Sequence, residues 1–219
     1  MNYMIGCNYW GSKYGTEMWA NWDGESVDKD LEMLSKYGVK YMRVFPLWRD
    51  FQPIHTLYTF ENEKREYRLH GKTLITDEFG LDKDCMEHFE EFLGYVKKHG
   101  MKVIVSIVTG WMSGRMFVPP AIEGRNIIND PEALKFQVKF VRGFVRHFKD
   151  SDVIEYWDLG TNATACLKLQ QKKKLTCGQQ QLQTQSAAKT IQEKSSRVCT
   201  HFIQQVYGQF RTRQNTPMF

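Results

Sequence analysis

Short apolar runs alternate with amphipathic helical patterns over the first 160 residues of this chain. The run Lys102–Val108 is almost continuously apolar, which is typical of a strand buried on both faces of a parallel sheet. Similar runs predict strands at Met4–Asn8, Tyr41–Phe45 and Val153–Leu159. Strands that alternate with helices in this way predict an α/β fold with one parallel sheet, because each helix carries the chain back across the sheet.

Three helices are expected between these strands. The first follows an N-cap at Ser26 and ends before Gly38, the second runs from about Asp82 to Gly100, and the third follows a cap at Asn129 or Asp130. The expected buried stripes are Val27, Leu31, Leu34 and Tyr37; Met86, Phe89, Phe92, Leu93 and Val96; and Leu134, Val138, Val141, Phe144, Val145 and Phe148. Four strands and three helices in this order predict a (β/α)8 TIM barrel truncated to about its first four βα units.

The segment 46–81 is long for a connection inside a compact domain, and loops of that length are usually functional. Leu57–Phe60 and Glu66–Leu69 are expected to pair as a hairpin within it.

The composition changes abruptly after residue 160. Residues 161–219 contain one acidic residue, Glu193, against nine Lys and Arg, and 12 of the 14 Gln of the chain, whereas all six Trp lie before them. We therefore divide the chain into 1–160, half of a barrel, and 161–219, a Gln- and Lys-rich tail without sustained helical or strand periodicity.

Several functional classes are disfavoured. No stretch approaches the roughly 18 to 20 apolar residues of a membrane span, and Met1–Trp10 does not resemble a secretion signal, so we expect a cytoplasmic protein. Cys7 and Cys85 are expected to be reduced core thiols, and we expect no metal and no cofactor. Lys168 and Lys172 to Lys174 leave a nucleic-acid-binding arm as an alternative for the tail, but four Lys beside Gln repeats are a weak signal, so we expect neither a nucleic-acid nor a membrane partner.

Aromatic and polar residues follow the predicted strands at their carboxyl ends, where βα barrels place their function. Sugar rings pack on indoles and their hydroxyl groups need charged or amide partners. The candidate substrate-binding residues are Asn8, Trp10, Arg43, Trp48 and Trp111. Trp19 and Trp22 also lie in these loops, where packing inside the loop is the alternative. For Arg43 the alternative is a plain ion pair with a neighbouring acid.

The residues resemble a known family at this point. The runs Ile5–Trp10, Arg43–Phe45, Val108–Pro120 and Val153–Gly160 are similar to segments of the cellulase/mannanase-type glycoside hydrolases of family five. In that family the fourth strand ends W-x-L-G-N-E, where the Glu is the general acid/base, and a second Glu on strand seven is the nucleophile. The resemblance thus implies retaining hydrolysis of β-linked glycans by two carboxyl groups about 5 to 5.5 Å apart.

Both catalytic carboxyl groups are missing from the places that the resemblance predicts. Gly160 is followed by Thr161 and Asn162 instead of Asn-Glu, no carboxylate occurs between Asp158 and Glu193, and the chain stops before strands seven and eight could form. We therefore assign no catalytic residue in this chain.

The genetic code suggests why. One permitted set of codons for Gly160 to Cys166 is GGA ACG AAT GCA ACT GCC TGY. From the last base of the glycine codon the triplets become AAC GAA TGC AAC TGC CTG, which encode Asn-Glu-Cys-Asn-Cys-Leu. The same shift over Leu175 to His201 permits a helical apolar pattern and then a Val-Ile-Ser-Gly strand, as the family would have between strands four and five. We therefore hypothesise a one-base deletion in the Gly160 codon.

The resemblance implies a glycoside hydrolase lineage whose partner is a β-linked oligo- or polysaccharide, with this chain inactive. A non-catalytic glycan-binding or pseudogene-derived remnant is the alternative. A third possibility is a chain that misfolds, because half a barrel exposes two sheet edges and an uncovered apolar face, which predicts poor stability.

Overall fold

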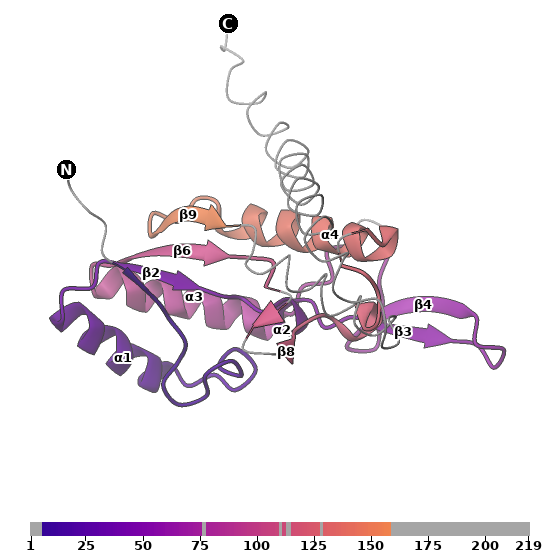
Figure 1. The fold of residues 1–219 in the computed structure, drawn as a ribbon, viewed down its shortest axis with the longest axis horizontal. Coiled ribbons are helices and arrows are strands. Elements are labelled where there is room, and N and C mark those ends of the chain that lie inside the picture. The colour runs from indigo at the N-terminus through magenta and orange to yellow at the C-terminus, as the bar shows by residue number, and fades with distance from the viewer. Residues whose placement is uncertain (1–5, 76–77, 110, 113–114, 128, 159–219) are drawn as a thin grey trace, which may run out of the picture.

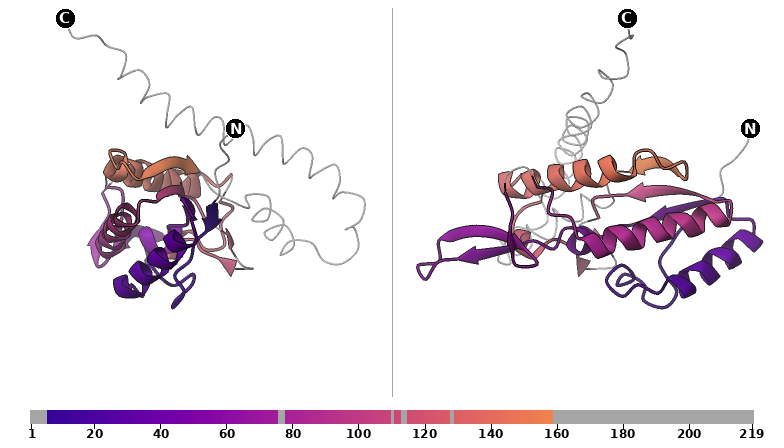
Figure 2. Two further views of the ribbon diagram at one scale, coloured as in Figure 1. Left: turned by 90° about the vertical axis from the view of Figure 1, so that its left-hand side faces the viewer. Right: turned by 180° about the vertical axis from the view of Figure 1, so that it is seen from behind.

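A four-stranded parallel sheet organises the computed structural model, which describes residues 6–75, 78–109, 111–112, 115–127 and 129–158, without the side chain of Trp111. The strands are β1 (Gly6–Asn8), β2 (Tyr41–Val44), β6 (Lys102–Ser106) and β9 (Ile154–Asp158), in the order β1-β2-β6-β9 (Figure 1). Helices α1 (Gly24–Lys36), α3 (Lys83–Lys98) and α4 (Pro131–Phe148) connect them and lie outside the sheet (Figure 2). The α/β fold of four successive strands is thus confirmed.

The two faces of the sheet differ in burial. Met42 and Val44 of β2 and Val103 and Val105 of β6 are fully buried in one core with the helices. Tyr41 and Arg43, which alternate with Met42 and Val44 along β2, are half-buried. Because successive strand residues point to opposite faces, the helices cover one face and the other carries Tyr41 and Arg43.

The helix ends follow the sequence with two corrections. Gly38 and Gly100 have φ of +81° and +64°, the left-handed conformation expected after a helix. The N-cap of α1 is Asp23, not Ser26: its Oδ1 accepts the Ser26 backbone N–H at 3.0 Å. The helix ends at Lys36, so Tyr37 is its C-cap residue. Tyr37 is 82% exposed and does not join the buried stripe as predicted.

The buried face of α4 is wider than the predicted stripe. Leu134 and Val138 are half-buried, whereas Phe136 and Phe140, which we did not predict, are buried at 2% and 0% exposure. The helix therefore faces the core with more of its surface than a narrow stripe allows.

The segment after β2 forms more structure than a loop. The predicted hairpin is present as β3 (His55–Tyr58) and β4 (Lys64–Leu69), extended by β5 (Lys72–Thr73), and it projects from the body beyond the carboxyl ends of the strands (Figure 1). A short helix, α2 (Trp48–Phe51), precedes it and was not predicted. The connection after β6 contains β7 (Trp111–Met112), β8 (Arg115–Met116) and the 3-10 helix η1 (Pro120–Ile122). Of the helices described, none is long and apolar enough to cross a membrane.

Asp130 caps α4 and provides a test of the local structure. Its Oδ1 accepts the backbone N–H groups of Glu132 and Ala133 at 2.9 and 3.0 Å, and these bonds hold the pKa of its carboxyl below the ordinary value. We expect Asp130→Ala to lower the free energy of unfolding by about 1 kcal/mol, whereas Asn129→Ala has little effect. Since the folded state depresses this pKa, the cap stabilises above about pH 4 and its contribution is lost as the pH falls through the folded pKa.

Urea unfolding of the two variants at neutral and acidic pH measures this difference. Equal losses for both variants, or a loss for Asp130→Ala that is unchanged in acid, would contradict the assignment of the cap.

Candidate functional site

Three polar side chains from neighbouring strands meet near the carboxyl end of the sheet. Asp158 of β9 accepts a hydrogen bond at Oδ2 from Arg43 Nε of β2 at 3.0 Å, and a second, shorter one from Arg43 Nη2. Ser106 of β6 donates its hydroxyl to the same oxygen at 3.0 Å and accepts Arg43 Nη2 at 3.3 Å. The parallel order of the strands produces this cluster, because carboxyl ends of parallel strands lie at one edge.

The cluster is partly open to solvent. The side chains of Arg43 and Asp158 are 27% and 32% exposed, whereas Ser106 is fully buried. The guanidinium of Arg43 also lies 5.1 Å from the centre of the Phe45 ring. The ion pair that was the alternative for Arg43 is therefore present, with Asp158 as its partner, and Arg43 remains partly exposed on the sheet face that the described helices do not cover.

Two other predicted residues lie beside Arg43. Trp10 stacks on Phe45, with ring centres 5.0 Å apart and 12° between the planes, and keeps part of its surface exposed. Asn8 is exposed and is the register partner of Arg43 on the edge strand β1. Asn8 thus lies beside Arg43 across the sheet, and Trp10 and Arg43 both contact Phe45, so an amide, an indole face and a charge lie in one region.

Trp48 requires a correction. It was predicted to contact a sugar, but its side chain is fully buried, and its indole N–H donates to Gln52 Oε1 at 2.7 Å. Helix α2, which was not predicted, directs the Trp48 side chain into the core, so its indole ring has no exposed surface for a sugar. The side chain of Trp111 lies outside the described residues.

The two remaining loop tryptophans pack against each other. Trp19 is 1% exposed, and Trp22 stacks on it at 5.7 Å and on His88 at 5.4 Å. Trp22 also donates to Glu91 of α3 at 2.7 Å. The packing alternative therefore describes this pair, which fastens the loop after β1 to α3.

A second charged group, which sequence reasoning missed, joins the loops at the rim of the same edge. Arg49 donates to Glu17 and to Asp50, both at 2.8 Å, and lies over the ring of Phe117 at 5.1 Å. Burial raises the pKa of Asp50, although Arg49 opposes the effect, and Asp50 Oδ2 is buried without a hydrogen-bond partner. Glu17 lies far from Arg49 and Asp50 in the sequence, and the three residues form no recognisable motif. They come together only when the two loops fold.

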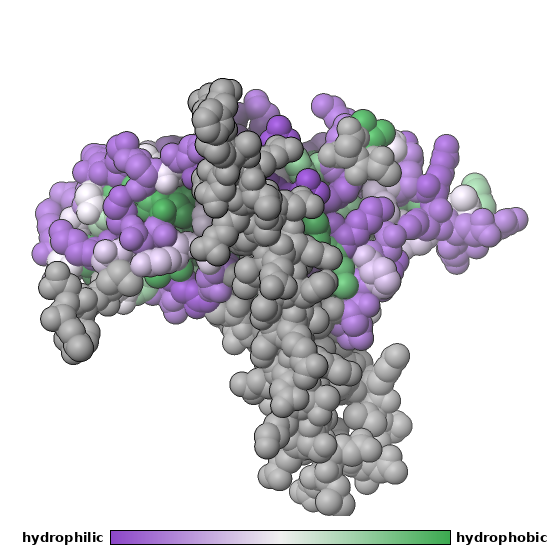
Figure 3. Space-filling model, turned by 90° about the horizontal axis from the view of Figure 1, so that it is seen from above, coloured by the Kyte–Doolittle hydropathy of each residue, from purple (hydrophilic) through white to green (hydrophobic). Residues whose placement is uncertain are grey.

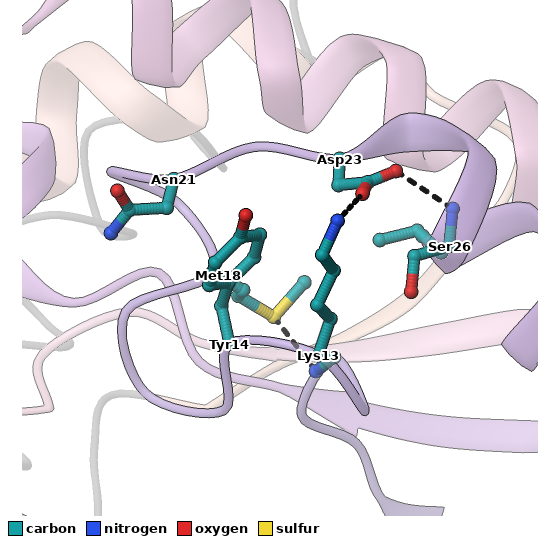
Figure 4. A pocket seen from close by; sticks show the side chains of 8 residues that line it. Lys13, Tyr14, Met18, Asn21, Asp23 and Ser26 are labelled. Atoms are coloured by element: carbon teal, nitrogen blue, oxygen red, sulfur yellow. Dashed lines mark hydrogen bonds and ion pairs between the residues drawn. The ribbon is translucent and has the colours of Figure 1, made fainter.

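A small pocket lies inside the loop between β1 and α1, lined by Lys13, Tyr14, Met18 and Asn21 (Figure 4). Lys13 Nζ donates to Asp23 Oδ2 at 2.6 Å, and this bond lowers the pKa of Asp23, the residue that also caps α1. The Lys13–Asp23 ion pair in the pocket wall thus holds the loop against the start of α1.

Four of the described histidines contact carbonyl or carboxylate groups. His88 donates to the Trp19 carbonyl, and His70, His99 and His147 pair with Asp82, Asp28 and Glu90. Cys7 and Cys85 are free thiols, and burial raises the pKa of both. Within the described ranges, no three His, Cys, Asp or Glu side chains lie close enough to hold a metal ion. Gly160, Thr161, Asn162 and the rest of the predicted tail lie outside those ranges.

The fold resembles solved glycoside hydrolases. An exo-β-1,4-mannosidase from Opitutaceae bacterium strain TAV5 is 24% identical, with a TM-score of 0.60, over 74% of this chain and 26% of its own. A GH5_18 enzyme from Streptomyces cattleya, in complex with Manβ1-4GlcNAc, is 22% identical, with a TM-score of 0.56, over 71% of this chain and 33% of its own. A GH5_18 structure from Bifidobacterium longum subsp. longum is 19% identical, with a TM-score of 0.58, over 73% of this chain and 34% of its own.

The chain therefore spans about a third or less of the length of these structures. At these identities the likeness shows the fold, that of one part of a (β/α)8 barrel found in GH5 enzymes. No protein-family model and no curated protein matches the sequence.

Proposed function

We propose that this chain is the first half of a retaining glycoside hydrolase for β-linked glycans. The observation that carries the proposal is the placement of Arg43, with Asp158 and Ser106, at the carboxyl ends of successive barrel strands beside the half-buried indole of Trp10. The solved structures with this fold include a β-mannosidase and a complex with a β-linked disaccharide, which supports a mannose-containing substrate.

The chemistry assigned to the site follows from these groups. The Trp10 ring offers an apolar face for a sugar, and the Asn8 amide offers a donor and an acceptor to its hydroxyl groups. Arg43 offers a fixed positive charge next to the last residues of β9, where a catalytic carboxylate of the resembled family would follow Gly160. Asp158 neutralises Arg43 in this chain and holds its guanidinium in place.

We further propose that the chain is inactive because a one-base deletion in the Gly160 codon replaced the Asn-Glu of the family with Thr161-Asn162. Residues 161–219 are then sequence translated out of frame, which accounts for their change in composition. The nucleotide sequence across this codon in the gene and its close relatives tests the idea. Uninterrupted long frames in the relatives that also encode Thr-Asn-Ala would contradict it.

A non-catalytic glycan-binding role is the second candidate. It is favoured by the exposed Asn8 and the half-buried Trp10, which need no carboxylate pair to contact a sugar. We expect a β-1,4-linked mannose disaccharide to bind the chain, and Trp10→Ala to weaken that binding by roughly tenfold, because truncating an aromatic contact commonly costs more than about 1 kcal/mol.

Isothermal titration calorimetry measures this effect, with Tyr37→Ala as the control because Tyr37 is an exposed aromatic residue on the C-cap of α1. Absence of any binding heat, or equal binding by both variants, would exclude a sugar surface at Trp10.

A further inference from the structure

Both outer edges of the parallel sheet are open within the described residues. The sheet order places β1 at one edge and β9 at the other, and no described strand pairs with the outer side of either. Tyr156 of β9 is 50% exposed, and Gly6 and Asn8 of β1 are also exposed. Parallel sheets are normally buried on both faces, so these edges require a cover.

The edge strands carry few of the features by which proteins block unwanted pairing. Such edges usually carry charged side chains, above all Lys, or Pro or a bulge. Neither Gly6–Asn8 nor Ile154–Asp158 contains Lys, Arg or Pro. Of the two acidic residues of β9, Asp158 is paired with Arg43 and Glu155 is exposed. The one irregularity of β9 lies in its pairing with β6, on the inner side.

On the sheet face that the described helices do not cover, the two edges differ in the size of their side chains, large on β9 and small on β1. Trp157 packs against Phe144 of α4, so its neighbour Tyr156 points to the opposite face, in the row of Arg43 and Ile104. β9 thus presents a large ring there. β1 presents Gly6, where a Cβ would lie 2.7 Å from the Tyr41 carbonyl oxygen, and the small amide Asn8.

We propose that the cover is a second copy of this chain, paired edge to edge so that β9 of each copy lies beside β1 of the other. A twofold axis along the barrel direction makes the two seams identical and keeps all the strands parallel. Four strands from each copy give eight, the number at which side chains fill a barrel interior, as in the (β/α)8 structures that this fold resembles. Figure 3 shows the molecule from above, with hydrophobic residues visible between hydrophilic ones.

Light scattering on the purified full chain tests the proposal. We expect a mass of twice 25.8 kDa at micromolar concentration. Tyr156→Lys and, on the other edge, Asn8→Lys should each raise the dimer dissociation constant at least about a hundredfold, because either places an unpaired charge inside the closed barrel. Tyr37→Lys makes the same chemical change as Tyr156→Lys on an exposed residue outside the sheet and should leave the dimer intact.

Circular dichroism establishes that each variant keeps the fold. Should Tyr156→Lys perturb β9, Asn8→Lys still tests the proposal, because Asn8 is exposed and its replacement removes no packed side chain. A chain that is monomeric at every concentration would overturn the proposal and leave residues 159–219 or another partner as the cover. A dimer that survives both edge substitutions, or open-ended aggregates that ignore them, would overturn it as well.

Discussion

Inserting one base into the Gly160 codon should produce a protein that hydrolyses a β-mannoside, whereas we expect no detectable glycosidase activity from the present chain. The insertion restores Asn-Glu directly after the glycine, at the end of the strand that carries Asp158. A general acid/base contributes about 10² to 10⁴ in rate. The covalent route also needs the strand-seven nucleophile of the family, so the test uses the restored frame of the gene through strand seven. The expected change is therefore far larger than that of any substitution in the present chain.

The measurement is release of nitrophenol from a nitrophenyl β-mannoside by the restored and unrestored proteins. The matched control changes the restored glutamate to glutamine, which keeps the frame and removes the acid. Activity in the glutamine control equal to that of the restored protein would contradict the assignment. So would cleavage by the unrestored chain that depends on a side chain in residues 161–219.

The parts of the fold that could be predicted depend on local signals. The glycines at 38 and 100 end helices because a left-handed φ suits them, and the apolar run of β6 predicts a strand. The prediction that both faces of this strand are buried was wrong for the described residues, since Lys102 and Ile104 are only half-buried. The cap of α1 was placed three residues too late because Ser26 and Asp23 are both good caps. The hydrogen bond that decides between them exists only in the folded chain.

The site was predicted in part for the same reason. Position at a strand end is a property of the sequence order, so the places of Arg43 and Asn8 on neighbouring strands could be predicted, whereas their contact with a sugar stays a prediction. Exposure is a property of tertiary packing. Trp10 and Trp48 both follow strands, yet α2 buries one of them, and no periodicity in a four-residue helix reveals this. The rim group of Glu17, Arg49 and Asp50 combines two separate loops and leaves no local pattern.

Phe89→Ala should bring the described core close to unfolding. Phe89 is fully buried on α3, and its ring contacts Trp19 at 5.4 Å, Phe51 at 6.1 Å and Phe144 at 5.0 Å between centres, with Phe92 and Phe148 also adjacent. It therefore joins the loop after β1, α2 and α4 to α3. Removing such a ring costs about 3 to 5 kcal/mol through lost burial and the cavity left behind. A typical domain has a total stability of about 5 to 15 kcal/mol, so little would remain.

The matched control is Phe60→Ala, since Phe60 is fully exposed at the tip of the hairpin and its loss should change stability by less than about 0.5 kcal/mol. Urea midpoints at a constant m-value compare the two variants, because an unchanged m-value means that the same surface is exposed on unfolding. Similar midpoints for both would place Phe89 outside the core. An unsubstituted chain without any cooperative transition would mean that half a barrel, with both sheet edges open, cannot hold this cluster together.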